Sequence, residues 1–422
     1  MPIPTEEKIM LARAVFNDFR VEKPTAVTVA ISSKCVNKCI FCPTNGPCMS
    51  EGDYDAVIDD PMLGKHSAKW LKPKVERIEW MKKNRPFMSF SEYKKVTDEL
   101  ADLGVQDVWL IGFGEPLLNP DAKKIIKYSC KKFPTVGITS NGDLMDDNWM
   151  EYLGKYKIHL GISLDAYDQE SRRKIHGVPE SDFNRTLALA KKYKDKLPGI
   201  SASYVLNKLN FKQIEIFLDK CKEAGIRGVG FYRLMTVPQS TNFQLTEKEY
   251  REAEKKIIKY KKENPDMYPG LLNVDETLKK DFSLPCFEPM RFFLINSDGS
   301  VFGCNRSYQN LGNVLDTSVK EVWNGKPYRK FRKEAFYDLR RNKKSLANCA
   351  CYECGCTNPM NREIFEWGKE NFGWKKSRFN FFLAKQKPRI LWEKFSNKVV
   401  NSASKSPMVR NIYYTVKNWR GN

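Results

Sequence analysis

Histidine is scarce in this chain of 422 residues, which has only His66, His159 and His176. Metal sites that depend on imidazole ligands are therefore disfavoured. The chain also lacks any apolar run near the roughly 20 residues that a membrane-spanning helix needs. Its first residues lack the basic and then apolar pattern of a signal peptide. These absences predict a cytoplasmic protein.

Cysteine, by contrast, is plentiful, because the chain has 12. In a cytosolic chain of this size, cysteines indicate metal ligands rather than disulfides. Most of them fall into three groups along the sequence. Cys130 and Cys221 lie outside these groups, in helical patterns, and we expect them to be small core residues.

Three cysteines near the N-terminus, Cys35, Cys39 and Cys42, have the spacing C-x3-C-x2-C. Three thiolates this close can bind three irons of a [4Fe–4S] cluster, which normally has four cysteine ligands. The fourth iron would stay open to another ligand, and an open coordination site is where metal chemistry takes place. A zinc site would usually be closed by four ligands and often includes histidine. The pattern therefore favours iron–sulfur over a zinc knuckle or three buried thiols.

This motif, with Phe41 directly before its last cysteine, resembles the signature of the radical S-adenosylmethionine (SAM) enzymes. The resemblance implies that SAM binds the open iron and is cleaved, on electron transfer, to a 5′-deoxyadenosyl radical that abstracts hydrogen from a substrate. It also implies an external one-electron donor such as a flavodoxin or ferredoxin. In the family, the aromatic residue at the position of Phe41 lies against the adenine.

Alternating strand and helix patterns follow the cysteine motif, after an irregular stretch at 43–86. The pattern predicts strands at 26–32, 107–111, 135–139, 158–164, 199–206 and 228–234, and helices near 121–132, 182–193 and 211–224. Capping boxes at Ser89 and Thr246 predict two further helix starts. Six strands alternating with helices indicate an α/β fold with a parallel sheet, either doubly wound or a barrel. The family resemblance implies a partial (β/α)6 barrel with its chemistry at the C-terminal strand ends.

The changes in composition predict five regions. They are a lead at 1–26, the barrel at 27–240, a helix and linker at 241–285, a cysteine-rich auxiliary cluster domain at 286–373, and a basic aromatic tail at 374–422.

The sequence Gly-Phe-Gly-Glu-Pro after the second strand resembles the family's Gly-Gly-Glu-Pro motif, which contacts the amino group of SAM. Gly114 and Glu115 match best, because Phe113 interrupts the paired glycines. A small residue lets the backbone approach a ligand closely, and a carboxylate can pair with an amine. An ordinary turn between strand and helix is the alternative.

Three further residues at strand ends are predicted to contact SAM or the substrate. Ser140 and Asn141 lie in a Thr-Ser-Asn-Gly turn after the third strand, although such turns are common. Ser163 matches the Ser-Leu-Asp motif of the family, which implies a hydrogen bond to SAM. The Asp165 side chain is a candidate for holding the barrel rim together.

A second cysteine group resembles the auxiliary-cluster domains called SPASM and twitch. Cys286, Gly299 and Cys304 form the pattern C-x12-G-x4-C, and the pair Cys351 and Cys354 follows. The full SPASM pattern has seven cysteines and two clusters, and part of it is absent here. The resemblance therefore implies the shorter form, with these four cysteines holding one auxiliary [4Fe–4S] cluster.

Two points about this second site stay open. Cys349 or Cys356 could replace either of the last two ligands, and the spacings also permit a zinc site with four cysteines. Four protein ligands would close the cluster to substrate, so its expected task is to take up an electron.

The sequence names no substrate. An auxiliary electron acceptor favours a dehydrogenase-like oxidation, and removing hydrogen at a hydroxyl carbon needs a base. Arg233 and Tyr204, near predicted strand ends, are the candidate catalytic residues. Because only about 26 residues precede the first strand, we expect no leader-binding domain. We therefore expect a small hydroxylated substrate such as a sugar or cyclitol derivative. The alternatives are a radical SAM maturase of peptides or proteins, and a non-enzymatic protein that binds metal and nucleic acid.

The net charge is +21, and about half of it comes from the tail, where 12 Lys or Arg after Trp374 face one acid, Glu393. Aromatic and aliphatic residues alternate with these charges. The tail could pack on the barrel, contact an anionic membrane surface or bind nucleic acid, which is the least favoured alternative. The sequence therefore predicts a cytoplasmic protein with a peripheral membrane contact as an open option.

Overall fold

The computed structural model describes residues 3–46, 55–60, 64–234, 237–272, 284–305, 307, 309–337, 359–380 and 382–383. The chain separates into two compact units, Arg13–Arg362 and a second unit made of Met1–Ala12 with Glu363–Asn422. Among the described residues, no helix combines the length and the apolar character needed to cross a bilayer.

A nine-stranded sheet forms the centre of the Arg13–Arg362 unit, in the order β11-β10-β1-β4-β5-β6-β7-β8-β9. All neighbours are parallel except β10 and β11, which are antiparallel. The strands are β1 Ala26–Val29, β4 Asp107–Leu110, β5 Thr135–Ser140, β6 His159–Ser163, β7 Ile200–Leu206, β8 Gly228–Arg233, β9 Tyr268–Leu272, β10 Phe292–Ile295 and β11 Val301–Phe302. A separate two-stranded sheet pairs β2 Val57–Asp60 with β3 Gly64–Ser67.

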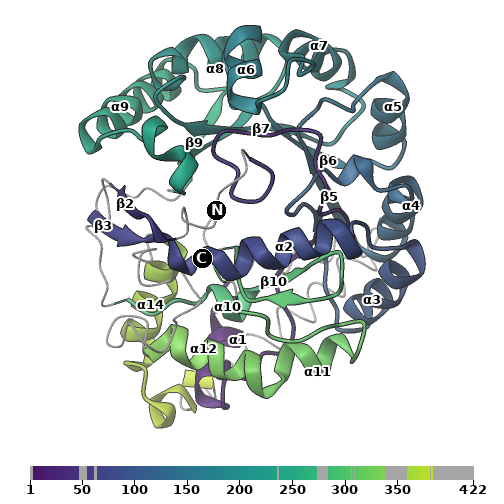
Figure 1. Ribbon diagram of the computed structural model, residues 1–422. Helices are drawn as coiled ribbons and strands as arrows, with labels where there is room; N and C mark the ends of the chain where they lie inside the picture. The colour runs from purple at the N-terminus through teal and green to yellow at the C-terminus, as the bar shows by residue number, and fades with distance from the viewer. Residues whose placement is uncertain are drawn as a thin grey trace, which may run out of the picture. The chain divides into compact units, whose positions relative to one another are not determined.

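Helices surround the parallel strands on the outside, as Figure 1 shows for α3, α4, α5, α7, α8 and α9. The helices from the insertion onward are α2 Lys72–Asn84, α3 Phe90–Asp102, α4 Ala122–Lys132, α5 Asp147–Lys155, α6 Gln169–His176, α7 Phe183–Tyr193, α8 Ile214–Glu223, α9 Glu247–Glu263, α10 Glu288–Arg291, α11 Val319–Asn324, α12 Lys326–Tyr337 and α14 Pro359–Phe372. The predicted capping boxes at Ser89 and Thr246 are both present. This architecture confirms the predicted α/β fold with a partial barrel.

All six predicted strands are present, as β1 and β4 to β8, but the sheet is larger than predicted. β9 lies in the predicted linker, and β10 and β11 lie in the predicted auxiliary domain. β10 pairs directly with β1, with Ala26 opposite Phe292. Residues after Cys286 therefore contribute to the barrel sheet, and α2 provides regular structure within the stretch that we expected to be irregular.

The hairpin of β10 and β11 explains the spacing of the second cysteine group. Its turn closes with a hydrogen bond from the Asn296 amide to the Ser300 carbonyl, 2.9 Å long. Gly299 in this turn has φ +82°, and a Cβ there would lie 2.4 Å from Asn313 Oδ1. Glycine is therefore required. Cys286 precedes the hairpin and Cys304 follows it, so the glycine of the C-x12-G-x4-C pattern is the residue that forms the hairpin turn.

Aromatic rings pack together within the Met1–Ala12 and Glu363–Asn422 unit. The ring centroid of Phe372 lies 5.2 Å from Trp374 and 4.9 Å from Phe379. An ion pair of 2.7 Å joins Lys8 to Glu363. Most of the predicted basic tail falls on residues 384–422, outside the described residues, so its role stays a prediction.

Candidate functional site

The cysteine loop follows β1 at the C-terminal edge of the sheet and rests on the end of α6. The Lys38 amide donates to the His176 carbonyl at 2.9 Å, and the Ile40 amide donates to the Ile175 carbonyl at 3.0 Å. This docking requires glycine at 177, where φ is +71° and a Cβ would lie 2.3 Å from the Lys38 carbonyl oxygen. Backbone contacts thus fix where the loop lies before any cofactor is considered.

Amide groups point at the sulfurs of this loop. The Asn37 backbone amide donates to Cys35 Sγ at 3.4 Å, and the Asn45 backbone amide donates to Cys42 Sγ at 3.2 Å. Asn141 donates its side-chain amide to Cys35 Sγ at 3.6 Å. Burial raises the pKa of Cys35 to about 12. Burial, and then the neighbouring Cys42 thiol, also raise the pKa of Cys39. A metal held by these sulfurs would bind them as thiolates.

The donor set fits an iron–sulfur cluster. Cys35, Cys39 and Cys42 lie on one loop, and each cysteine of a [4Fe–4S] cluster binds a different iron. Amide groups donate to two of these sulfurs. Hydrogen bonds to the sulfurs are also among the features that set the potential of such clusters.

Glu115 connects this loop to the next two strands of the sheet. Its backbone amide donates to the Lys34 carbonyl at 2.7 Å, and a Cβ on the preceding Gly114 would lie 2.3 Å from the same oxygen. Its carboxylate accepts from the backbone amides of Leu117 at 3.2 Å and Asn141 at 2.8 Å. The side chain is only 2% exposed. Burial raises the pKa of Glu115 to about 7, against the effect of these hydrogen bonds.

The other predicted SAM contacts lie along the same edge. Ser140 and Asn141 are buried, and the Ser140 hydroxyl accepts from the Gly142 amide at 3.0 Å. The Ser163 carbonyl accepts from Arg172 Nη1 at 3.2 Å. Phe41 is half-buried on the cysteine loop. Hydrogen bonds therefore bring Cys35, Asn141 and Glu115 together, and Arg172 connects the Ser163 carbonyl to the Asn141 carbonyl.

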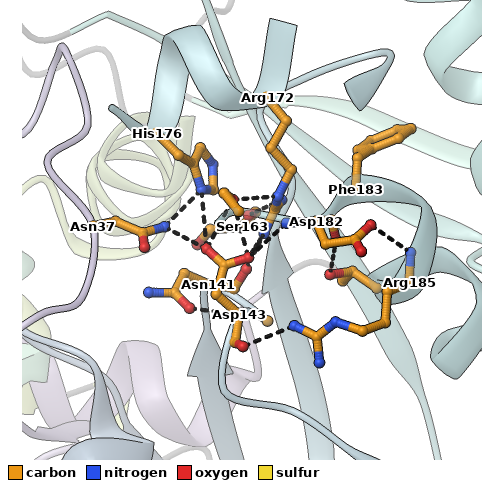
Figure 2. A network of polar contacts seen from close by, with 12 residues as sticks. Asn37, Asn141, Asp143, Ser163, Arg172, His176, Asp182, Phe183 and Arg185 are labelled. Carbon is orange, nitrogen blue, oxygen red and sulfur yellow. Dashed lines mark hydrogen bonds and ion pairs between the residues drawn. The ribbon is translucent and has the colours of Figure 1, made fainter. Parts of the chain in front are cut away.

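A buried polar network lies behind the cysteine loop (Figure 2), and Asp165 is the one member that the sequence-based predictions include. Its members are Asn37, Asp143, Asp165, Arg172 and His176, and all but Asp143, which is partly buried, are at most 3% exposed. One feature of the sequence could have indicated this network: Arg172 and His176 are polar and lie four positions apart, on the buried face of α6. The predicted rim role of Asp165 agrees with a hydrogen bond of 2.7 Å from the Val205 amide to its carboxylate.

The two candidate catalytic residues already have protein partners. Arg233 forms a two-pronged ion pair with Glu247, at 3.0 and 3.2 Å, and lies 4.1 Å from the ring centroid of Tyr250. Tyr204 has no exposed surface, and its hydroxyl donates to the Asn210 carbonyl at 2.9 Å. These contacts give both residues a structural role, and a catalytic role for either stays a prediction.

The second cysteine group is described only in part. Cys286 and Cys304 are half-buried, and the Cys286 amide donates to the Ala335 carbonyl at 3.1 Å. Cys349, Cys351, Cys354 and Cys356 lie outside the described residues. Phe113, which interrupts the glycine motif, contacts Phe302 two positions before Cys304, with centroids 6.2 Å apart.

Family models match both cysteine-bearing regions. The radical SAM superfamily model matches residues 29–221, and a model of an iron–sulfur cluster-binding domain, SPASM, matches residues 286–355. The chain belongs to the radical SAM superfamily and carries a SPASM domain. These matches confirm the predicted cofactors, which are a [4Fe–4S] cluster that binds SAM and an auxiliary iron–sulfur site.

Similar proteins add detail to this radical SAM assignment. The chain is 26% identical over 241 residues to the antilisterial bacteriocin subtilosin biosynthesis protein AlbA of Bacillus subtilis, covering 56% of this chain and 53%, or about half, of that relative. It is 24% identical over 294 residues to the PqqA peptide cyclase of Granulibacter bethesdensis, covering 64% of this chain and 76% of the relative. The crystal structure of SuiB from Streptococcus suis has the same fold, with TM-score 0.59 and 18% identity over 81% of this chain and 74% of that one.

These matches contradict the predicted small hydroxylated substrate and the small-molecule partner. The two curated relatives are named for bacteriocin biosynthesis and for a peptide cyclase. The sequence-based prediction of substrate class is therefore wrong, and the dehydrogenase-like reaction attached to it has no support among these relatives.

Proposed function

We propose that this radical SAM enzyme modifies a peptide or protein substrate, as a maturase. The observation that carries the proposal is the similarity to a peptide cyclase over 64% of the chain. The similarity to a bacteriocin biosynthesis protein agrees with it.

In this proposal the cysteine loop holds the first cluster, and residues at the neighbouring strand ends bind SAM. Cys35, Cys39 and Cys42 hold the first cluster, which when bound supplies the electron that cleaves SAM. Glu115 accepts a hydrogen bond from the amine of SAM, for which its buried position between β4 and β5 is well suited. Asn141 donates towards Cys35 from the same turn.

The proposed task of the second site follows from the electron count of a ring-forming reaction. Joining two positions of a peptide removes two hydrogen atoms. The 5′-deoxyadenosyl radical takes one of them as an atom, and the other leaves as a proton and an electron. Cys286 and Cys304, with Cys351 and Cys354, would hold the auxiliary cluster that accepts this electron. An external donor such as a flavodoxin or ferredoxin supplies the electron that starts each turnover.

The proposal is tested with the full-length chain, reconstituted anaerobically with iron and sulfide. The chain is reduced in the presence of SAM and short peptides encoded beside its gene, and the products are analysed by mass spectrometry. The expected result is 5′-deoxyadenosine together with a peptide that has lost two hydrogen atoms, and neither product from Cys35→Ala. Formation of 5′-deoxyadenosine with every peptide left unchanged would overturn the peptide substrate while leaving the radical SAM chemistry in place.

A further inference from the structure

Asn37 lies between Cys35 and Cys39 in the sequence, and its buried side chain meets Asp143 and His176. Figure 2 shows its amide between Asp143 and His176. The amide nitrogen donates to Asp143 Oδ2 at 2.8 Å and lies 2.8 Å from His176 Nδ1. These three residues come from the cysteine loop, the turn after β5 and the end of α6. We call them the clamp.

The chemistry of these groups fixes the direction of each hydrogen bond. Although burial favours the neutral acid, the charge of Arg172 and the hydrogen bonds from Asn37 and Ser181 hold the pKa of Asp143 well below its usual value. A carboxylate only accepts, so the NH2 group of Asn37, and not its oxygen, must face Asp143. The second amide hydrogen then points at His176 Nδ1, which must be the acceptor. An uncharged His176 therefore carries its hydrogen on Nε2.

His176 Nε2 is buried, lacks a hydrogen-bond partner among the described residues, and lies 3.7 Å from Asp165 Oδ2. The ring is thus oriented with its acceptor towards the cysteine loop and its donor towards the end of β6. Rotating the ring by a half turn would place Cδ2–H, which accepts no hydrogen bond, against the Asn37 amide and would leave that buried donor without an acceptor. The ring orientation is therefore specified by the loop residue.

The clamp also reaches the predicted SAM contacts through Arg172. This guanidinium is fully buried and donates to Asp143 Oδ1 at 3.1 Å and to the Ser163 carbonyl at 3.2 Å. It also donates to the Asn141 carbonyl. Asp143 is thus the common partner of Asn37 and of Arg172, which holds the two strand ends.

We propose that Asn37, Asp143 and His176 are positioning residues for the first cluster. Their hydrogen bonds hold the Cys35–Cys39 segment in one register against the strand ends that carry Asn141 and Ser163. The proposal goes beyond the choice of substrate, because it concerns how the cluster is retained and placed relative to SAM. The competing explanation is that these side chains only fill space under the loop.

Two substitutions of His176 separate hydrogen bonding from packing. His176→Leu fills a similar volume but offers no acceptor to Asn37. His176→Asn is smaller but keeps an oxygen acceptor near the position of Nδ1. Asn37→Ala removes both amide hydrogen bonds from the other side. Asn184→Ala, on the exposed face of α7, is the matched control for this change.

Each variant is purified as the full chain and reconstituted anaerobically. Iron release to a chelator and the electron paramagnetic resonance spectrum of the reduced protein, with and without SAM, are then measured. Loss of a residue that supports metal ligands typically weakens metal binding about 10- to 100-fold. His176→Leu and Asn37→Ala should therefore release the iron of one cluster about 10- to 100-fold faster, and the spectral change on SAM addition should differ from wild type. His176→Asn and Asn184→Ala should stay close to wild type.

The proposal is overturned if His176→Leu matches wild type, or if His176→Asn loses iron as fast as His176→Leu, because packing would then explain the result. If His176→Leu does not give the circular dichroism spectrum of a folded chain, Asn37→Ala against Asn184→Ala decides the question. None of these measurements uses a peptide, so their failure is distinct from failure of the proposed maturase function.

Discussion

Glu115→Gln should abolish a pH dependence of SAM binding that the wild-type chain shows between pH 6 and pH 8. The pKa of Glu115 is raised to about 7 because the carboxyl group is buried. A raised pKa in an acid means that the neutral form is present below pH 7 and the charged form above it. Only the charged form pairs fully with the cationic or iron-bound amine of SAM, so binding should strengthen as the pH rises.

The size of the effect follows from the ionised fraction. With a pKa of about 7, roughly a tenth of Glu115 is charged at pH 6 and roughly nine tenths at pH 8. The apparent dissociation constant varies inversely with the competent fraction, so wild-type affinity should improve about tenfold over this range. At pH 8, Glu115→Gln also loses a hydrogen bond to a charged group, worth about 1.5–3 kcal/mol, and should bind SAM about 10- to 100-fold more weakly.

Equilibrium dialysis of radiolabelled SAM against the anaerobically reconstituted chain at pH 6, 7 and 8 measures both effects. Ionisable groups of SAM titrate equally in every sample, so the difference between wild type and variant isolates Glu115. Glu223→Gln, an exposed carboxylate at the end of α8, is the matched control. A flat wild-type profile, or a tenfold rise that persists in Glu115→Gln, would refute the reasoning.

Three further predictions concern the second cluster, a close backbone contact and a buried hydroxyl. Replacing Cys351 and Cys354 together with alanine should lower the iron content from about eight to about four per chain while SAM cleavage survives, and unchanged iron would contradict the ligand assignment. Gly114→Ala places a Cβ 2.3 Å from a backbone oxygen and should lower the unfolding temperature and the cluster content, whereas Gly270→Ala, with no atom within 4 Å, should change neither; equal behaviour of the two in thermal unfolding would count against the close contact. Tyr204→Phe loses one hydrogen bond and should cost about 1 kcal/mol of stability with 5′-deoxyadenosine formation retained; a large loss of that product would restore Tyr204 as a catalytic residue.

Strand positions could be predicted from the sequence because alternation and β-branching are local signals. The neighbours of a strand are not local. β10 pairs with β1 across 266 positions, and nothing in either segment indicates that partner. β10 and β11 were therefore assigned to a separate domain, although they extend the barrel sheet.

The candidate site shows the same limit. Cys35, Cys39 and Cys42 are recognisable because ligands on one loop have a fixed spacing. Asn37 and His176 have no such spacing, since they meet only when the cysteine loop docks on α6. The substrate class could not be read from the motifs, because these residues start the radical, whereas other surfaces select the molecule that receives it.

The pairing of β1 with β10 also constrains the order in which the molecule is assembled. β1 leaves the ribosome 266 residues before the strand that covers one of its edges. Closing a loop of that length costs about 5 kcal/mol of chain entropy, which four register pairs and their side chains must offset. The strands from β4 to β8 can associate earlier, because each adjoins its predecessor in the chain. The loop that carries the first three thiols thus gains its full support only after β10 has been made.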